Sequence, residues 1–313
     1  MRKAVIDLGT NTFHLFIVEF LNGKMNTLYK EKIAVKIGQN GISKGKIAPD
    51  ATKRAIHALS IFKTVIDQFE VKDVRGVATS AIRNAKNGQK LLDEIFDETG
   101  IRINIISGDR EAELIFGGVK AALDMRIDNQ LVMDIGGGSV EFIIGNKDSI
   151  LWKQSFEIGA QRLLDKFHTE DPMPPQRIED LFAWLNPQLE SLTSAISQFN
   201  PTGLIGCSGT FDTIYDIFLS ETGSKKDAHA TAFDLPIKAY HDIHRELLIK
   251  DRQERLLIPG MVTMRVDMIV VASCLISFVQ EHLEINEIKV CAYALKEGLL
   301  FSEDTAKNVT ETI

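Results

Sequence analysis

Two short apolar runs, far apart in the chain, share one pattern of hydrophobic and polar positions. Residues 4–7 read Ala-Val-Ile-Asp and residues 131–134 read Leu-Val-Met-Asp. Each run predicts a buried strand that ends in an aspartate, followed by a turn of small residues whose backbone N–H groups are open to a phosphate. The turn residues are Gly9, Thr10, Asn11 and Thr12 in the first copy and Gly136, Gly137, Gly138 and Ser139 in the second. We therefore expect a phosphate held from two sides.

The first copy opens a series of strands and helices. Strand-forming residues over 12–19 and 25–37 complete a three-strand meander with the first run. Apolar residues then recur at helical spacing over 51–69, directly behind Pro49-Asp50. The remaining predicted elements of this half are strands at 74–78 and 101–106 and helices at 90–98 and 111–123.

The second copy repeats the meander and leads into a more helical region. The predicted elements are strands at 140–144 and 149–158, a helix over 176–199 broken at Pro187, a strand at 204–207, a helix beginning near Phe211, a helix at 261–282, and a strand and helix within 287–301. The repeated order predicts an α/β protein of two duplicated units with a ligand cleft between them. We place the domains at 1–124 and 125–295, and expect a helix within 296–313 to pack back on the first domain.

Composition agrees with this organisation. The chain has 313 residues, more than one core usually organises, and its 44% hydrophobic and 25% charged residues are typical of soluble globular proteins. Its start lacks a signal-peptide pattern, and the most apolar segment, 268–279, is shorter than the roughly 20 residues of a membrane helix. We therefore expect a cytoplasmic protein without a membrane partner, in which Cys207, Cys274 and Cys291 are reduced.

The net charge of −7 argues against nonspecific binding to nucleic acid. It does not exclude a small polyanionic substrate, because local N–H groups, a metal ion and a few arginines can hold such an anion whatever the total charge.

Three carboxylates are candidate metal ligands. Asp134 is the first choice and Asp7 the second, because each ends a strand beside a phosphate-binding turn, and Mg²⁺ binds one or two carboxylates together with phosphate and water. Glu141 follows Asp134 by seven residues and could orient a metal-bound water. The alternatives are that the aspartates only cap turns and that Glu141 is a surface strand residue.

Three further segments offer groups for phosphate chemistry. Glu111 begins a predicted helix at the junction of the two halves, where it could act as a general base or simply complement the helix dipole. Arg83 follows a strand end, and the residues alone leave a phosphate contact and a solvent-facing position equally open. A third glycine-containing loop before a helix is another candidate anion site, formed by Gly206, Ser208, Gly209 and Thr210.

Other features are given structural interpretations. His241 and His244 stand three residues apart on a predicted helix, but no third ligand is evident, so a solvated face is the preferred interpretation. Ser208 lacks the sequence around a nucleophilic serine, so loop geometry explains it better than covalent catalysis does.

Together the motifs resemble those of the exopolyphosphatase and guanosine pentaphosphate phosphohydrolase family, a branch of the actin-like, sugar-kinase and Hsp70 superfamily. The resemblance runs through nearly the whole chain. It rests on residues 7–12, 78–85, 106–112, 134–141 and 206–210, with weaker markers at 259–267 and 295–298.

This resemblance implies two ribonuclease-H-like, actin-like ATPase domains around a cleft, and Mg²⁺-dependent hydrolysis of a terminal phosphoanhydride. It implies that Glu111 positions and deprotonates the attacking water and that Arg83 contacts phosphate. Asp134 and Glu141 match the metal-site carboxylates of the family. Four positions depart from the family pattern: threonines at 10 and 12 replace serines, Val140 replaces a threonine, and Lys296 replaces an arginine.

The leading functional expectation is an exopolyphosphatase that uses Mg²⁺, with Mn²⁺ as a substitute, and prefers short polyphosphate. One alternative is hydrolysis of guanosine pentaphosphate at the same site. Others are a regulator that binds this nucleotide without turnover and, less favoured, an ATP-using kinase. A homodimer is expected by analogy only.

Overall fold

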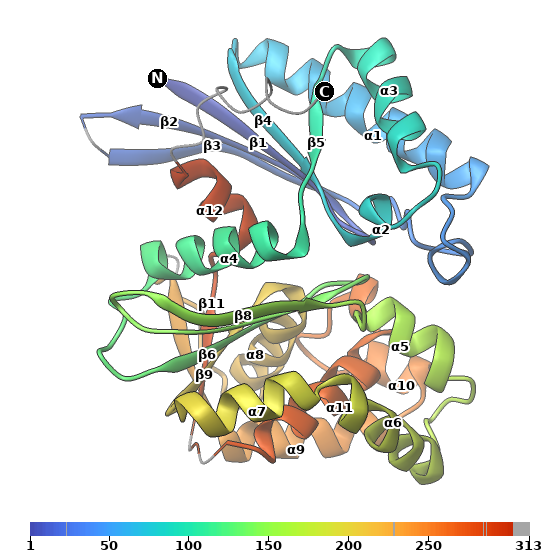
Figure 1. Ribbon diagram of the computed structural model, residues 1–313, viewed down its shortest axis with the longest axis vertical. Coiled ribbons are helices and arrows are strands. Elements are labelled where there is room, and N and C mark those ends of the chain that lie inside the picture. The colour runs from blue at the N-terminus through green and yellow to red at the C-terminus, as the bar shows by residue number, and fades with distance from the viewer. Residues whose placement is uncertain (23, 228, 284, 286, 303–313) are drawn as a thin grey trace.

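The computed structural model describes residues 1–22, 24–227, 229–283, 285 and 287–302. Two β-sheets lie one above the other, with helices between them and on their outer faces (Figure 1). The first sheet has the strand order β3-β2-β1-β4-β5, in which β1, β2 and β3 form the predicted antiparallel meander and β4 and β5 run parallel to β1. Its strands are β1 (Arg2–Leu8), β2 (Phe13–Leu21), β3 (Lys24–Ile33), β4 (Asp73–Ala78) and β5 (Ile103–Ile105).

The second sheet repeats this order and adds one strand. Read from its meander it is β8-β7-β6-β9-β11-β10, so its first five strands match those of the first sheet. The added strand, β10, pairs antiparallel with β11 and was not predicted from the sequence pattern. The strands are β6 (Gln130–Ile135), β7 (Val140–Gly145), β8 (Ile150–Phe156), β9 (Gly203–Cys207), β10 (Ala232–Pro236) and β11 (Glu287–Cys291). The predicted fold class, a duplicated α/β unit, is confirmed.

Helices on the outer face of the first sheet follow the predicted pattern. The core of this domain includes Ala51, Ala55 and Leu59, which lie on one face of α1. Pro49 is the first residue of α1, where its missing N–H has no partner to lose, and Gly100 ends α3 with φ +68°, a left-handed conformation that favours glycine. The helices are α1 (Pro49–Gln68), α2 (Ser80–Arg83) and α3 (Gly88–Thr99).

The helices of the second domain correct three predicted boundaries. The predicted break at Pro187 occurs at Leu189, because the proline lies in the last turn of α6. The helix predicted from near Phe211 begins at Ser208, directly after β9, and the one predicted over 261–282 is shortened to α11 because 263–265 form a separate 3₁₀ turn. The helices are α5 (Ala160–Phe167), α6 (Pro175–Gln188), α7 (Glu190–Phe199), α8 (Ser208–Thr222), α9 (Ile237–Ile249), α10 (Arg252–Leu256) and α11 (Ile269–Gln280).

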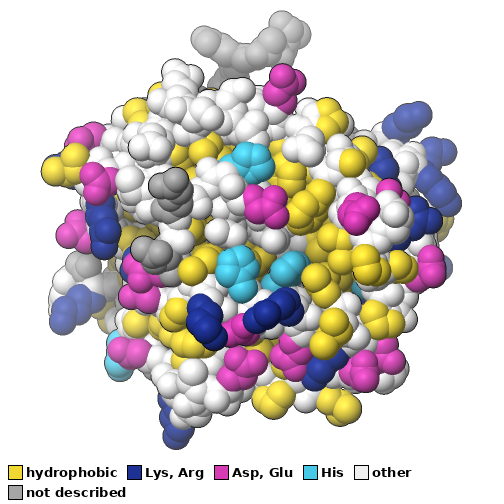
Figure 2. Space-filling view, turned by 90° about the horizontal axis from the view of Figure 1, so that it is seen from below, with side chains coloured by type: hydrophobic (Ala, Val, Ile, Leu, Met, Phe, Trp, Pro, Cys, Tyr) yellow, Lys and Arg dark blue, Asp and Glu magenta, His cyan; other side chains and the backbone are white. Residues whose placement is uncertain are grey.

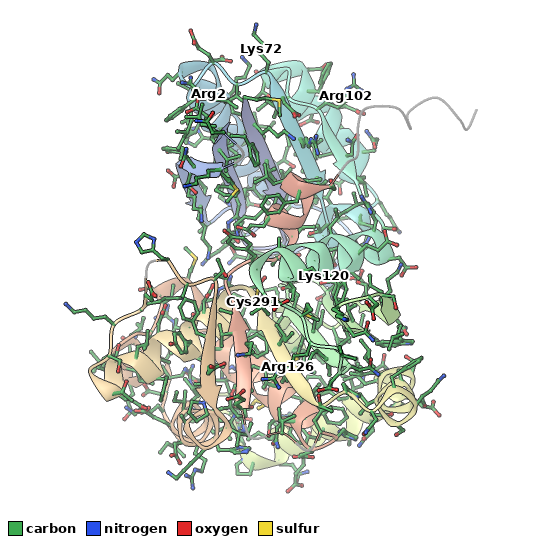
Figure 3. All side chains as sticks on the ribbon, turned by 90° about the vertical axis from the view of Figure 1, so that its left-hand side faces the viewer. Arg2, Lys72, Arg102, Lys120, Arg126 and Cys291 are labelled. Atoms are coloured by element: carbon green, nitrogen blue, oxygen red, sulfur yellow. The ribbon has the colours of Figure 1, made fainter. Side chains whose placement is uncertain are left out.

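Two helices fill the layer between the sheets. Figure 3 shows α4 (Gly108–Ala122), marked by Lys120, in this layer, with Cys291 of β11 below it. A hydrophobic cluster joins this helix and α12 (Leu295–Phe301) to both sheets, for example to Val5 above and Val132 below. The helix α12 also packs on β1, as expected for a C-terminal helix that returns to the first domain. Residues 303–313 of that expectation lie outside the described residues.

Glycines allow α4 and α12 to approach closely. A Cβ atom at Gly118 would lie 2.2 Å from the carbonyl oxygen of Ala294, and one at Gly298 would lie 1.7 Å from that of Leu114. Such distances leave no room for a side chain, so the spacing of the two helices requires glycine on each.

The strands of the first sheet all precede residue 124 and those of the second all follow it; the domain division itself stays a prediction. None of the described helices is long and apolar enough to cross a membrane.

Two neighbouring glycines of α4 test this packing. We expect Gly118→Ala to lower the free energy of unfolding by about 1–3 kcal/mol, because the added methyl group overpacks the contact with α12. Gly117→Ala is the matched control, since a Cβ atom there meets nothing within 4 Å; it should raise the free energy of unfolding by about 0.5–1 kcal/mol through helix propensity. Urea denaturation measures both, and equal effects would refute the packing argument.

Candidate active site

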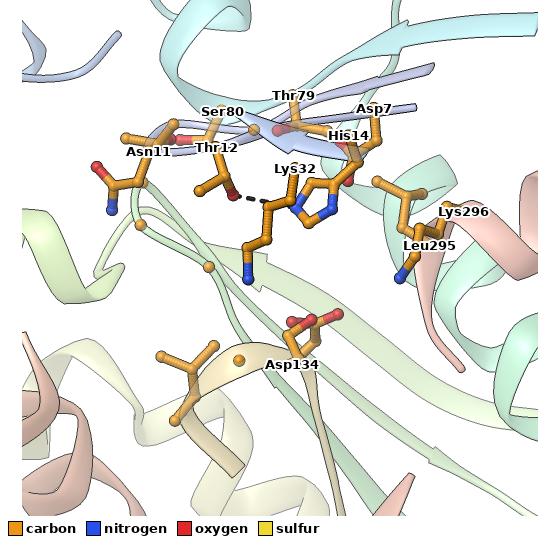
Figure 4. Close-up of a pocket in the computed structure, with 18 of the residues that line it drawn as sticks. Asp7, Asn11, Thr12, His14, Lys32, Thr79, Ser80, Asp134, Leu295 and Lys296 are labelled. Atoms are coloured by element: carbon orange, nitrogen blue, oxygen red, sulfur yellow. Dashed lines mark hydrogen bonds between the residues drawn. The ribbon is translucent and has the colours of Figure 1, made fainter. Parts of the chain in front are cut away.

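The two predicted phosphate-binding turns face each other across a cavity of about 380 Å³. Each turn is closed by the same kind of internal hydrogen bond. The N–H of Gly9 donates to the carbonyl of Thr12 at 3.1 Å, and the N–H of Gly136 donates to the carbonyl of Ser139 at 3.0 Å. Figure 4 shows the walls of the cavity, with Asp7 and Asp134 on opposite sides. The duplication inferred from sequence therefore extends to the geometry of the turns.

The second turn directs its backbone N–H groups away from α5. The carbonyls of Gly136, Gly137 and Gly138 accept hydrogen bonds from the backbone N–H groups of residues 159–161. In a trans peptide the N–H points opposite to the carbonyl, so the N–H groups of residues 137–139 point to the cavity side. A row of such N–H groups is an anion-binding concavity.

The first turn is arranged in the same way. The carbonyls of Thr10 and Asn11 accept hydrogen bonds from Gly38 at 3.0 Å and Lys36 at 2.8 Å, which turns the N–H groups of Asn11 and Thr12 in the opposite direction. A Cβ atom at Gly137 would lie 2.4 Å from Asn11 Nδ2. The glycine thus leaves room for the side chain of Asn11 where the two turns approach each other.

Carboxylates stand at the strand ends beside the turns. Asp134 lies opposite Glu141 in the β6–β7 ladder, and Asp7 lies opposite His14 in the β1–β2 ladder; all four line the cavity. His14 is thus the counterpart of Glu141 in the duplicated unit, a relation that the sequence analysis missed. The spacing of seven residues from each aspartate was the available signal.

Burial makes these carboxylates unusually weak acids. It raises the pKa of Asp7 to about 7, with Lys296 opposing the shift and Asp134 adding to it. Burial, and after it the neighbouring Asp134, raise the pKa of Glu141 to about 7. The pKa of Asp134 is raised by burial although the side chain of Ser208 is hydrogen-bonded to it. The cavity therefore concentrates negative charge that a cation would neutralise.

The carboxylates suit a cation whose remaining ligands are supplied by water and by the substrate. Among the described residues, no three His, Cys, Asp or Glu side chains form a metal-holding group. Mg²⁺ needs only one or two carboxylates, and Asp7 Oδ1 is a buried oxygen without a hydrogen-bond partner in the described structure. Asp7, Asp134 and Glu141 are therefore suited to Mg²⁺ but do not form a closed cage.

Glu111 projects into the cavity from the start of α4. Ser107 caps this helix by accepting a hydrogen bond from the N–H of Arg110 at 3.1 Å. Only 6% of Glu111 is exposed, and Arg83 Nη1 donates to Glu111 Oε2 at 2.8 Å. Burial first, and Glu141 second, raise the pKa of Glu111 well above its ordinary value, while Arg83 lowers it. The glutamate is thus placed to exchange a proton with a bound water.

The third loop is only partly in the cavity. Ser208 and Gly209 line the cavity, whereas Gly206, Thr210 and Arg83 are not among its lining residues. A Cβ atom at Gly206 would lie 2.1 Å from the ring of Phe211, so this glycine serves packing, and Thr210 is buried. The structure therefore gives no support to the expected phosphate contacts of Gly206 and Thr210. Arg83 reaches the site through Glu111.

Several cationic residues of the cavity were missed. Lys32 and Arg265 line it, and Figure 4 shows Lys32 reaching toward the space between the two walls. Burial lowers the pKa of Lys32 to about 8, with Arg265 adding to the shift. Gly209 makes room for Arg265, since a Cβ atom at 209 would lie 2.3 Å from Arg265 Nη2. Lys296, noted only as a departure from the family pattern, also lines the cavity.

The histidines of α9 do not form a second site. Figure 2 shows histidines beside hydrophobic side chains on the face seen from below, where α9 lies in Figure 1. The ring of His244 stacks on Tyr240 and shares a hydrogen bond with Ser273 Oγ at 2.7 Å. Burial lowers the pKa of His244 to about 4. The preferred interpretation of a solvated face is therefore corrected for His244, which is half-buried and has a packing role.

Comparisons with known proteins agree with this geometry. The Ppx/GppA phosphatase family model matches residues 16–306. An exopolyphosphatase crystal structure from Cytophaga hutchinsonii is 46% identical, with a TM-score of 0.94, and the match covers 96% of this chain and 97% of the other.

Two curated relatives are longer than the matched region. A bifunctional 3-dehydroquinate synthase/phosphatase from Fusobacterium nucleatum is 35% identical over 67% of this chain and 33% of its own length. A guanosine-5'-triphosphate,3'-diphosphate pyrophosphatase from Photobacterium profundum is 26% identical over 95% of this chain and 58% of its own length. The chain thus spans less than two thirds of each of these two relatives.

The raised pKa of Asp7 gives a prediction about stability. A carboxyl group whose pKa is raised in the folded state binds its proton more tightly there than in the unfolded state. Its contribution to the free energy of unfolding therefore falls as pH rises from about 4, its unfolded pKa, through about 7. We therefore expect Asp7→Asn to become more stabilising at pH 8 than at pH 5, by about 2–3 kcal/mol. Urea denaturation without divalent metal measures the difference. Asp128→Asn, at an exposed position, controls for loss of one charge; a pH-independent effect of Asp7→Asn would contradict the argument.

Proposed function

The chain belongs to the Ppx/GppA phosphatase family, and on this basis we propose that it is a Mg²⁺-dependent exopolyphosphatase, which hydrolyses the terminal phosphoanhydride bond of inorganic polyphosphate. One observation carries this proposal: two facing N–H turns, the carboxylates Asp7, Asp134 and Glu141, and Glu111 paired with Arg83 converge on one cavity. The N–H turns suit a phosphate group and the carboxylates suit a cation. The glutamate suits activation of water.

In the proposed mechanism the terminal phosphate lies between the turns at residues 9–12 and 136–139. Glu111 holds a water beside the terminal phosphorus and takes its proton as the water oxygen attacks. The bond from this phosphorus to the bridging oxygen breaks, and the shortened chain leaves with that oxygen. Arg83 fixes the orientation of the Glu111 carboxylate and offers positive charge next to the developing negative charge. The N–H groups stabilise the equatorial phosphate oxygens. No covalent intermediate with the protein is needed.

A divalent cation completes the charge balance of the site. We propose that Asp134 and Glu141 hold it, with Asp7 beside them, and that Mg²⁺ is the physiological ion and Mn²⁺ a substitute. When bound, the cation would neutralise phosphate oxygens and favour the ionised forms of the buried carboxylates.

Guanosine pentaphosphate is the alternative substrate at the same site. The observation that favours it is the group of additional cations, Lys32, Arg265 and Lys296, that line the cavity and could hold further phosphates of such a nucleotide. A regulator that binds this nucleotide without hydrolysis is less well supported, because Glu111 and the metal-site carboxylates are all in place.

Replacing Glu111 tests the hydrolytic proposal. We expect Glu111→Gln to lower kcat for phosphate release from short polyphosphate by about 10²–10⁴-fold, because an amide cannot accept the proton. Binding of tripolyphosphate should be retained. Glu113→Gln is the matched control on the same helix, where Glu113 is half exposed and pairs with Arg110 and Lys153; its kcat should stay within about twofold of the intact protein.

The same assay chooses between the substrates. Release of phosphate from short polyphosphate, long polyphosphate and guanosine pentaphosphate is compared through kcat/KM. A higher value for guanosine pentaphosphate would replace the leading proposal with the alternative. Absence of release from all three substrates by the folded, intact protein would overturn hydrolysis in favour of a binding role.

Cation binding should depend on pH in a defined direction. The site binds a cation through ionised carboxylates, and burial raises the pKa values of Asp7 and Glu141 to about 7, so protons compete with the metal below that pH. We expect about 5 mM Mg²⁺ to raise Tm more at pH 8 than at pH 6, because a ligand that binds only the folded protein stabilises it. Asp134→Asn should remove most of the increase and Asp128→Asn should keep it; thermal unfolding with and without the metal provides the measurement.

A further inference from the structure

A single carboxylate beside the active site is surrounded by donors from both domains. Glu157 follows β8, and its two oxygens accept hydrogen bonds from Ser80 Oγ at 2.5 Å, Arg83 Nη2 at 3.1 Å and Arg162 Nη2 at 3.0 Å. Ser80 and Arg83 belong to α2 in the first domain, whereas Arg162 belongs to α5 in the second. The carboxylate therefore lies where the two domains meet.

This donor set suits a phosphate as well as a carboxylate. Two guanidinium groups and a hydroxyl converge on one anion, and guanidinium groups bind phosphate through paired N–H donors. The position of Arg162 is fixed independently of Glu157, because Arg162 Nε donates to the carbonyl of Gly138 at 2.8 Å. The donors would thus stay in place if the carboxylate left.

The position is immediately next to the proposed reaction centre. Arg83 Nη1 donates to Glu111 and Arg83 Nη2 donates to Glu157, so the two carboxylates lie on the two ends of one guanidinium group. Ser80 lines the cavity, and so does Gly138, which accepts from Arg162. A chain of phosphates whose end lies between the turns can therefore reach this position with its next phosphates.

The exposure of the side chains allows an exchange of anions. The side chains of Arg83 and Arg162 are 15% and 22% exposed, whereas that of Glu157 is 40% exposed. Burial raises the pKa of Glu157, but hydrogen bonds from Ser80, Asn84 and Arg83 outweigh it, so the net shift is downward and the group is ionised near neutral pH. Glu157 can turn to solvent without opening the core, while the arginines stay enclosed.

We propose that Ser80, Arg83 and Arg162 form a second phosphate subsite, occupied by the Glu157 carboxylate in the free protein and by a non-terminal phosphate of a bound polyphosphate. This inference rests on the proposed function and adds a specificity determinant to it. Glu157 then acts as an internal competitor that a single phosphate ion does not displace, because such an ion binds between the turns alone. A polyphosphate carries the extra charge needed to displace it.

The competing explanation is that Glu157 only ties the domains together. In that case its loss would loosen the cleft and weaken binding of every anion. The two explanations therefore predict opposite changes in affinity, and they differ in which anion responds.

The test measures binding in a protein that does not turn the ligand over. Isothermal titration in the Glu111→Gln background with Mg²⁺ compares inorganic tripolyphosphate with inorganic orthophosphate. We expect Glu157→Gln and Glu157→Ala each to lower the Kd of tripolyphosphate at least threefold and to change that of orthophosphate less than twofold. Arg162→Gln should raise the Kd of tripolyphosphate at least fivefold. Glu179→Gln, at an exposed position of the same domain, controls for removal of one negative charge.

Two outcomes would overturn the subsite. Weaker binding of both anions by the Glu157 variants, together with a lower Tm, would establish the tie between domains instead. Unchanged tripolyphosphate binding in correctly folded variants would show that Glu157 does not compete. The result is separable from the proposed function: tighter tripolyphosphate binding by a protein that hydrolyses no polyphosphate would keep the subsite and reject the exopolyphosphatase. Hydrolysis of polyphosphate by the intact protein, with tripolyphosphate binding unchanged in the Glu157 variants, would keep the exopolyphosphatase and reject the subsite.

Discussion

The dominant constraint on this structure is the burial of several carboxylates around one cavity. Asp7, Asp134, Glu141 and Glu111 line the same cavity, and burial raises the pKa of each. Such an arrangement is unfavourable for the empty protein and becomes favourable when a cation and an anionic substrate enter together. The site thus lowers the stability of the folded protein until ligands balance its charges.

The layer between the sheets makes this concentration of charge possible. The glycines of α4 and α12 bring the two helices into contact, and their apolar faces join both sheets in one hydrophobic cluster. Glu111 lies in the first turn of α4, and Lys296 lies in the first turn of α12. The packing of these helices therefore also sets where the two side chains meet the cavity. Stability and function therefore depend on the same helix pair.

Duplication explains the frame of the site, and departures from it explain the chemistry. Both halves provide an aspartate at a strand end and a turn with the same internal hydrogen bond. The partner across the ladder differs: Glu141 faces Asp134, whereas His14 faces Asp7 and shares a hydrogen bond with Thr12 Oγ1 at 3.0 Å. One half is therefore the richer in carboxylates, and the cation is expected on that side.

Local sequence determined all the strands except β10, the order of most helices and the two turns, because these depend on hydrophobic period, glycine content and hydrogen bonds between residues a few positions apart. The tertiary structure alone decided which charges meet. The pairing of Arg83 with Glu111, the place of Glu157 between the domains and the entry of Lys32 and Arg265 into the cavity join residues far apart in the chain. Their positions follow from how the domains and the helices between them pack, which no local pattern encodes.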